Sequence, residues 1–77
     1  MPKINVSSKE VEKVLKRNGF ILVSQKGSHQ QFKGTVNDMK RRVTVLANKR
    51  DFDIKTFQSM ARQSGLEEIE FLGNKKG

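Results

Sequence analysis

The 77-residue chain has no cysteine, no tryptophan and no tyrosine, and it has one histidine and one proline. Without cysteine it has no disulfide, no thiolate nucleophile and no cysteine-ligated zinc. A single histidine excludes a metal site built from several histidines, so we expect no metal and no other cofactor. These absences exclude a disulfide-bonded secreted scaffold and most classes of metalloenzyme.

Long hydrophobic runs are also missing. No apolar segment approaches the roughly 18 residues that span a bilayer, and the mean hydropathy is −0.69. Met1 to Asn5 lack the apolar segment of a secretory signal. We therefore expect a cytoplasmic protein with no membrane partner. The length suffices for one small domain, residues 1–77, with a frayed tail over about 73–77.

Acidic residues are half as numerous as basic ones: 16 Lys and Arg against eight Asp and Glu give a net charge of +8. Residues 26–50 hold seven of the basic residues and one acidic residue, Asp38. A positive field on so small a protein favours a polyanionic partner, and we favour nucleic acid. The alternative is a basic surface that serves only solubility.

Sequence patterns predict two helices. The first runs over residues 8–18, because Ser7 and Glu10 have capping-box spacing, Val6 and Val11 form a hydrophobic staple, and Asn18-Gly19 ends the apolar period. The second begins at Asp53 as N-cap and ends at Gly65, with Leu66 folding back on it. Beyond it, Ile69 and Phe71 alternate with glutamates, which favours a short fourth strand or an extended docking segment.

Three strands are predicted between the helices, over residues 20–23, 29–35 and 41–46. The order α-β-β-β-α gives an α+β fold, with a three-stranded antiparallel sheet and both helices on one face. Alternation points Phe32, Val43 and Val45 toward the helices. The opposite face then stays open to solvent and carries His29, Gln31, Lys33, Arg42 and Thr44.

Four segments together resemble a known family. They are Asn18-Gly19-Phe20, Gln25-Lys26-Gly27-Ser28-His29-Gln30-Gln31-Phe32, Arg42-Val43-Thr44-Val45 and Arg62-Gln63-Ser64-Gly65-Leu66. From about residue 7 to residue 66 the chain is similar to the HicA-type toxins of bacterial toxin–antitoxin modules. The resemblance implies a fold like that of double-stranded-RNA-binding domains. It also implies an endoribonuclease that cleaves mRNA (an mRNA interferase) and is neutralised by a HicB-type antitoxin.

The chemistry of RNA cleavage suits the single histidine. RNA carries its own nucleophile, the 2′-hydroxyl, so a protein needs chiefly to move protons and to stabilise charge on phosphorus. Histidine is the side chain best matched to proton transfer near neutral pH. We therefore predict a metal-independent ribonuclease with His29 as general base or general acid, and a lysine or water as its counterpart.

Phosphate binding is assigned to neighbouring residues. Lys26, Lys33, Arg41 and Arg42 are the predicted phosphate-binding side chains, and the backbone amides of Gly27 and Ser28 are predicted to add hydrogen bonds to a phosphate oxygen. The simpler alternatives are that His29 is an ordinary surface residue, that Gly27 serves a turn with positive φ, and that Ser28 is only a turn residue.

Two other functions remain open at this point. The same fold would also suit a non-catalytic RNA-binding module, or a protein whose basic face docks an acidic partner. Phosphate binding weakens steeply with salt, so a salt series separates RNA binding from the latter. We expect a monomer in isolation and a hetero-oligomer with the antitoxin.

Overall fold

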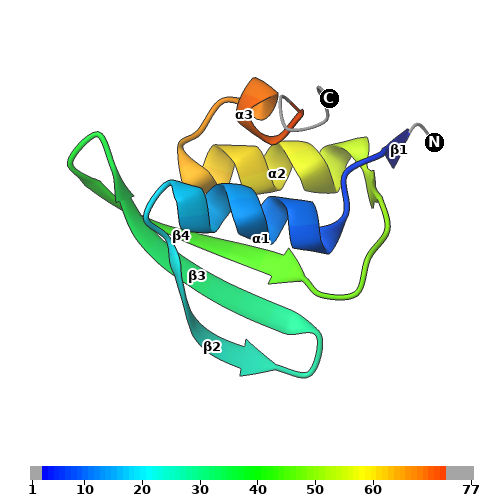
Figure 1. Cartoon of the computed structure of the whole chain (residues 1–77), viewed down its shortest axis with the longest axis horizontal. Coiled ribbons are helices and arrows are strands. Elements are labelled where there is room, and N and C mark those ends of the chain that lie inside the picture. Colours follow the sequence, from blue (N-terminus) through cyan, green and yellow to red (C-terminus); the bar gives the residue numbers. More distant parts are fainter. Residues whose placement is uncertain (1–2, 73–77) are drawn as a thin grey trace.

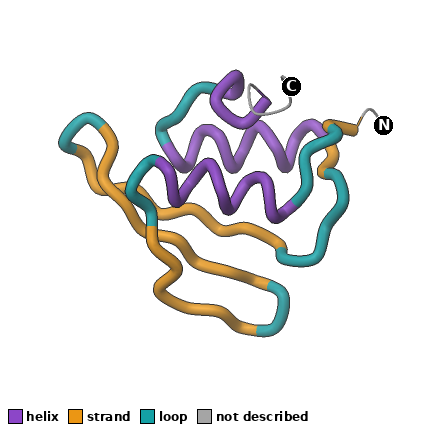
Figure 2. Tube along the Cα trace, in the orientation of Figure 1, coloured by secondary structure: helices purple, strands orange, loops and turns teal. Residues whose placement is uncertain are grey.

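The computed structural model describes residues 3–72, which form two layers, with helices above a sheet (Figures 1 and 2). The order of elements is β1 (Lys3–Ile4), α1 (Ser8–Arg17), β2 (Ile21–Lys26), β3 (His29–Val36), β4 (Met39–Leu46), β5 (Phe52–Asp53), α2 (Ile54–Ser64) and α3 (Glu68–Leu72). The predicted α-β-β-β-α order and the arrangement like that of double-stranded-RNA-binding domains are confirmed. β1, β5 and α3 are additions to it.

Helix α1 begins where the sequence predicts. The backbone N–H of Glu10 donates to Ser7 Oγ at 3.3 Å, and Glu10 Oε1 accepts from the Ser7 backbone N–H at 2.8 Å. This reciprocal pair satisfies two amides that the first turn leaves unpaired. The staple residues Val6 and Val11 are fully buried. Asn18 forms the C-cap, and Gly19 follows with φ 89°.

Strands β2, β3 and β4 form an antiparallel sheet in that order. The turn between β3 and β4 is made by Asn37 and Asp38, both with positive φ, as the turn chemistry of these residues allows. Phe32 lies opposite Val43, and both are fully buried with Val45, so the predicted inward face is confirmed. The face of this sheet turned away from the helices is called the open face below.

The core lies between the helices and the sheet. Its largest members are five phenylalanines, each almost inaccessible: Phe20, Phe32, Phe52, Phe57 and Phe71. At about 25 cal/mol per Å² of apolar surface, these side chains are the main source of stability in a domain of this size. None of the helices within residues 3–72 is long and apolar enough to cross a membrane.

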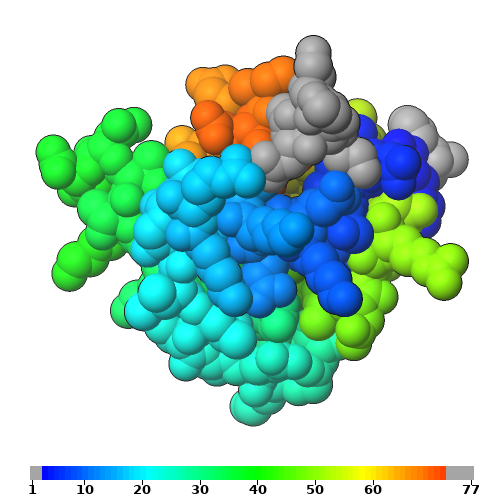
Figure 3. Space-filling model, viewed as in Figure 1, coloured from blue at the N-terminus to red at the C-terminus, as the bar shows by residue number. Residues whose placement is uncertain are grey.

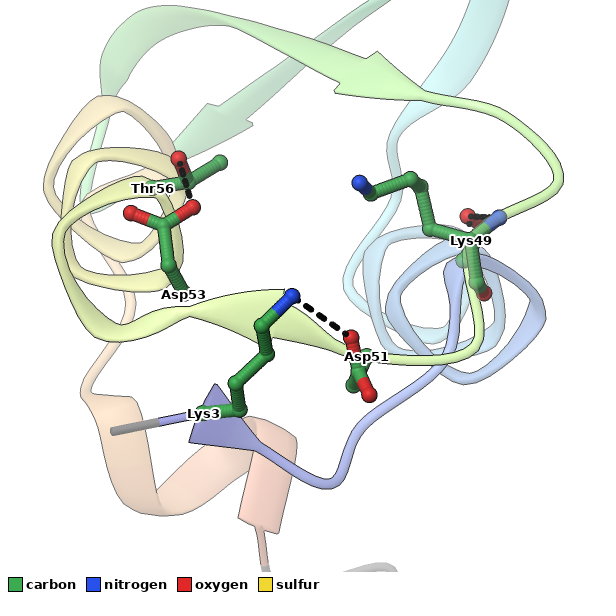
Figure 4. A network of polar contacts seen from close by, with 6 residues as sticks. Lys3, Lys49, Asp51, Asp53 and Thr56 are labelled. Carbon is green, nitrogen blue, oxygen red and sulfur yellow. Dashed lines mark hydrogen bonds and ion pairs between the residues drawn. The ribbon is translucent and has the colours of Figure 1, made fainter. Parts of the chain in front are cut away.

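The connection after β4 ends in a short strand that the sequence patterns did not predict. β5 pairs with β1, and Lys3 lies 3.6 Å from Asp51 at that junction (Figure 4). The Ser8 hydroxyl accepts from the Lys49 backbone N–H at 2.7 Å and donates to the Leu46 carbonyl at 2.7 Å. The start of α1 is thereby tied to the connection after β4.

Helix α2 begins after Asp53 and ends at Gly65, as predicted. The Thr56 hydroxyl donates to Asp53 Oδ1 at 2.8 Å (Figure 4), and this hydrogen bond holds the pKa of Asp53 below its ordinary value of 3.8. Gly65 has φ 76°, the left-handed conformation that closes a helix, and Leu66 packs against the core.

The strand or extended segment predicted around Ile69 and Phe71 is wrong, because residues 68–72 form helix α3. A helical turn buries Phe71 against Phe57, with ring centroids 6.0 Å apart and ring planes at 79°. Ile69 stays 68% exposed. The segment packs against α1 and α2, so a helical turn that directs Phe71 toward them buries its ring. The predicted tail over 73–77 lies outside the described residues.

Candidate nucleic-acid interface

The turn between β2 and β3 positions the histidine. Gly27 has φ 58°, a conformation that residues with a Cβ rarely adopt, so glycine suits this corner. The Gln25 side-chain amide donates to the Gly27 carbonyl at 3.0 Å, and the Ala47 backbone N–H donates to the Ser28 carbonyl at 2.7 Å. The turn is thus attached both to β2 and to the end of β4.

His29 is the first residue of β3 and lies between Lys26 of β2 and Leu46 of β4 in the sheet register. Its side chain is exposed, and no hydrogen bond within residues 3–72 uses the imidazole. Among these residues, neither ring nitrogen has a hydrogen-bond partner. A hollow of about 520 Å³ adjoins it, lined by Ser24, Lys26, Gly27, His29 and Gln31.

Further cross-strand pairs of β3 and β4, each called a rung below, extend the open face away from the histidine. Gln31 lies opposite Thr44, and its side-chain amide donates to the Thr44 hydroxyl at 3.0 Å. Lys33 lies opposite Arg42, and both are exposed. With a rise of about 3.4 Å per residue, Lys33 stands roughly 14 Å along β3 from His29.

Lys33 and Arg42 form a directly opposed pair of like charges. Such cross-strand pairs lower the stability of a sheet. Within residues 3–72 neither residue takes part in an ion pair. A phosphate bound between them would turn repulsion into two charge-assisted contacts, so this rung is suited to an anion.

The last rung of the open face was missed by the sequence analysis. Thr35 lies opposite Lys40, and a second hollow of about 520 Å³ there is lined by Gly19, Ile21, Lys33, Gly34, Thr35 and Lys40. The prediction began the third strand at Arg41, so Lys40 was not assigned to a face. The Asn37-Asp38 turn residues were the available signal, because a two-residue turn extends β4 back to Met39.

Arg41 is separated from the other predicted phosphate-binding residues. It lies opposite Gly34, and alternation turns it to the helix side of the sheet. Its guanidinium rests on the end of α2, where a Cβ built on Gly65 would come within 2.8 Å of Arg41 Nε. A cation there interacts favourably with the C-terminal end of the helix dipole. The structure therefore places Lys26, His29, Lys33 and Arg42 on the open face and Gly27 and Ser28 in the adjoining turn, and it places Arg41 on the other side of the sheet.

Among residues 3–72, no group of three or more His, Asp or Glu side chains is arranged to hold a metal ion. The open face carries an imidazole, three lysines and an arginine, with the backbone amides of the turn beside the imidazole. Together these groups can bind phosphates and transfer protons.

Comparison with known proteins identifies the family. Residues 8–66 match the family model for the HicA toxin of bacterial toxin–antitoxin systems, which covers most of the chain and includes the whole three-stranded sheet. No curated protein matches the chain. The match contains the turn, the histidine and the Lys33–Arg42 rung described above. The chain therefore belongs to the HicA toxin family of bacterial toxin–antitoxin systems.

Proposed function

We propose that this toxin is an endoribonuclease that cuts mRNA in the cytoplasm, with His29 as its catalytic residue and an antitoxin of HicB type as its inhibitor. Membership of a toxin–antitoxin family implies a cognate antitoxin. The observation that carries the nuclease proposal is the placement of an uncommitted imidazole on the same face as an opposed cation pair. One group can move protons and the other can hold the backbone of the substrate.

In the proposed reaction the 2′-hydroxyl oxygen of the RNA attacks the adjacent phosphorus, and the bond from phosphorus to the 5′-oxygen breaks. His29 either removes the proton from the 2′-hydroxyl or donates a proton to the departing 5′-oxygen. A water molecule or Lys26 provides the complementary transfer. The products are a 2′,3′-cyclic phosphate and a 5′-hydroxyl, and no metal takes part in this scheme.

Charge stabilisation is the second part of the proposal. Lys26 lies opposite His29, so its ammonium group can approach the phosphate whose protons His29 handles. The Gly27 and Ser28 amides add hydrogen-bond donors at the same corner. Lys33 and Arg42 bind a neighbouring phosphate and keep the strand on the open face.

The test is cleavage of a short RNA by purified protein in the presence of EDTA, comparing the parent with His29→Ala. We expect the substitution to reduce the cleavage rate roughly 10²–10⁴-fold without changing the unfolding temperature, because His29 is exposed. An RNA with one 2′-deoxynucleotide at the cut site should resist the parent there. Equal cleavage by both proteins would refute the role of His29.

The leading alternative, a non-catalytic RNA-binding module, gives a different result in the same assay. Such a module would bind RNA with a steep salt dependence, leave it intact, and show equal affinity with and without His29. Sedimentation of the purified protein tests the further expectation that it is a monomer without its antitoxin.

A further inference from the structure

The apolar run at the start of β2 is not buried. Ile21, Leu22 and Val23 are 63%, 40% and 43% exposed, although all three belong to the apolar run over which the sequence predicts a strand. Leu22 lies opposite the buried Phe32 and so faces the helix side, yet the helices do not extend far enough to cover it. Figure 1 shows β2 lying beyond both helices, and Figure 3 shows the corresponding cyan segment at the surface below α1.

The two outer strands of the sheet differ in how their edges are protected. On β4, the Gln63 side chain of α2 accepts a hydrogen bond from the Thr44 backbone N–H at 3.1 Å. On β2, no other strand of residues 3–72 pairs with the outer edge. Two features of β2 weakly oppose pairing with another strand: the bulge at Val23 and the lysine at its end, Lys26. An exposed apolar edge strand is a site at which another chain can add.

Charge selects the kind of partner that fits this edge. From Lys13 to Asn37 the chain contains five Lys and Arg residues and no Asp or Glu. A second copy of this chain would bring the same charges against them, which opposes self-association. A segment with acidic side chains would be attracted instead.

We infer that the apolar edge, Ile21 to Val23, is the docking site for an extended acidic segment of the cognate antitoxin, whose apolar side chains cover these three residues. The inference rests on the antitoxin partner named under the proposed function but not on RNA cleavage. The acidic side chains of that segment would lie near Lys26 at one end of β2 and Lys33 beside Ile21. The contact would therefore combine apolar burial with charge attraction.

The experiment measures the dissociation constant of the purified cognate antitoxin for variants of the toxin, all in a His29→Ala background. The double variant Ile21→Thr/Val23→Thr removes apolar surface but keeps β-branched residues suited to a strand. The control is Ile69→Thr, the same substitution at an isoleucine that is 68% exposed, against 63% for Ile21, but lies on α3. We expect the double variant to weaken binding at least about tenfold, and the control to change it less than about twofold.

Thermal unfolding of the double variant verifies that it remains folded, and a single Val23→Thr variant with a smaller loss serves if it does not. Parent-like binding by folded variants would overturn the inference. So would binding that does not weaken with added salt, or a toxin dimer that the substitutions dissociate. Because His29 is absent throughout, a failure of the nuclease proposal leaves this result unchanged, and the reverse also holds.

Discussion

Strand β4 lies beneath both helices and contributes two fully buried valines to the core, whereas all six residues of β2 are exposed. One outer strand of the sheet, β4, thus contributes to the core, whereas the other, β2, is accessible to solvent. His29 stands at the boundary, on the strand between them, next to a turn that β4 anchors from one side. Core packing is therefore concentrated on β4, whereas β2 offers exposed surface, so the same substitution should affect stability differently in the two strands.

The largest expected effect is a difference in the free energy of unfolding when the same substitution, Val→Ala, is made in each of the two strands. Val45→Ala should lower the free energy of unfolding by about 2 kcal/mol or more, because Val45 is fully buried and its loss leaves a cavity. Val23→Ala should lower it by less than about 1 kcal/mol, because Val23 is already 43% exposed. Urea unfolding measures both, and equal losses would contradict this difference.

Two glycines offer a second contrast between a packed position and an open one. A Cβ on Gly34 would lie 2.7 Å from Cγ of the buried Phe20, so Gly34→Ala should destabilise by about 1–3 kcal/mol through overpacking. A Cβ on Gly27 meets nothing within 4 Å, so Gly27→Ala should cost only the strain of its φ of 58°, about 1 kcal/mol. Thermal unfolding of the two variants should rank them in this order. The reverse ranking would show that the conformation of the turn at Gly27 contributes more to stability than the packing of Gly34 against Phe20.

The next effect concerns affinity. Replacing both Lys33 and Arg42 with uncharged residues should weaken RNA binding about tenfold, because two phosphate contacts are lost. The slope of log K against log salt concentration should become shallower by about 1.5–2. The matched control removes Lys9 and Lys13, two exposed cations on α1 that subtract the same charge from another part of the molecule. If the control weakens binding as much as the test pair, the open face is not the RNA-binding surface.

The smallest expected effect lies at the start of α2. Because the Thr56 hydroxyl lowers the pKa of Asp53, the ionised carboxylate stabilises the fold at pH values above the ordinary pKa of 3.8, and this contribution is lost as pH falls through the lowered pKa. Asp53→Asn should therefore be less stable than the parent near neutral pH, and the difference should vanish in acid. Thr56→Val should remove most of the same pH dependence. A difference that persists unchanged in acid would assign the effect to packing instead of charge.

Local signals made much of the fold predictable. The capping box at Ser7 and Glu10, the left-handed Gly65 and the alternation around Val43 each depend on a few adjacent residues, and each is confirmed. The face that carries His29, Lys33 and Arg42 followed from alternation alone, since a strand has a fixed period of two.

Features that depend on distant parts of the chain were not predictable. How far the helices extend over the sheet decides whether Leu22 is buried, and no local pattern encodes that distance. The segment around Phe71 alternates like a strand, but it forms a helix whose Phe71 packs against the distant Phe57. Arg41 was grouped with Arg42 by sequence proximity, although neighbouring strand residues face opposite sides.

Under the proposed function, His29 carries the RNA-cleaving chemistry of this toxin, and the exposed side chain is not needed for folding. The most direct measurement is growth and bulk mRNA integrity after inducible expression of the parent and of His29→Ala at equal protein levels. We predict that the parent arrests growth and degrades mRNA while the variant, still folded, does neither. Arrest by both proteins alike, or by neither despite folded protein, would contradict the account.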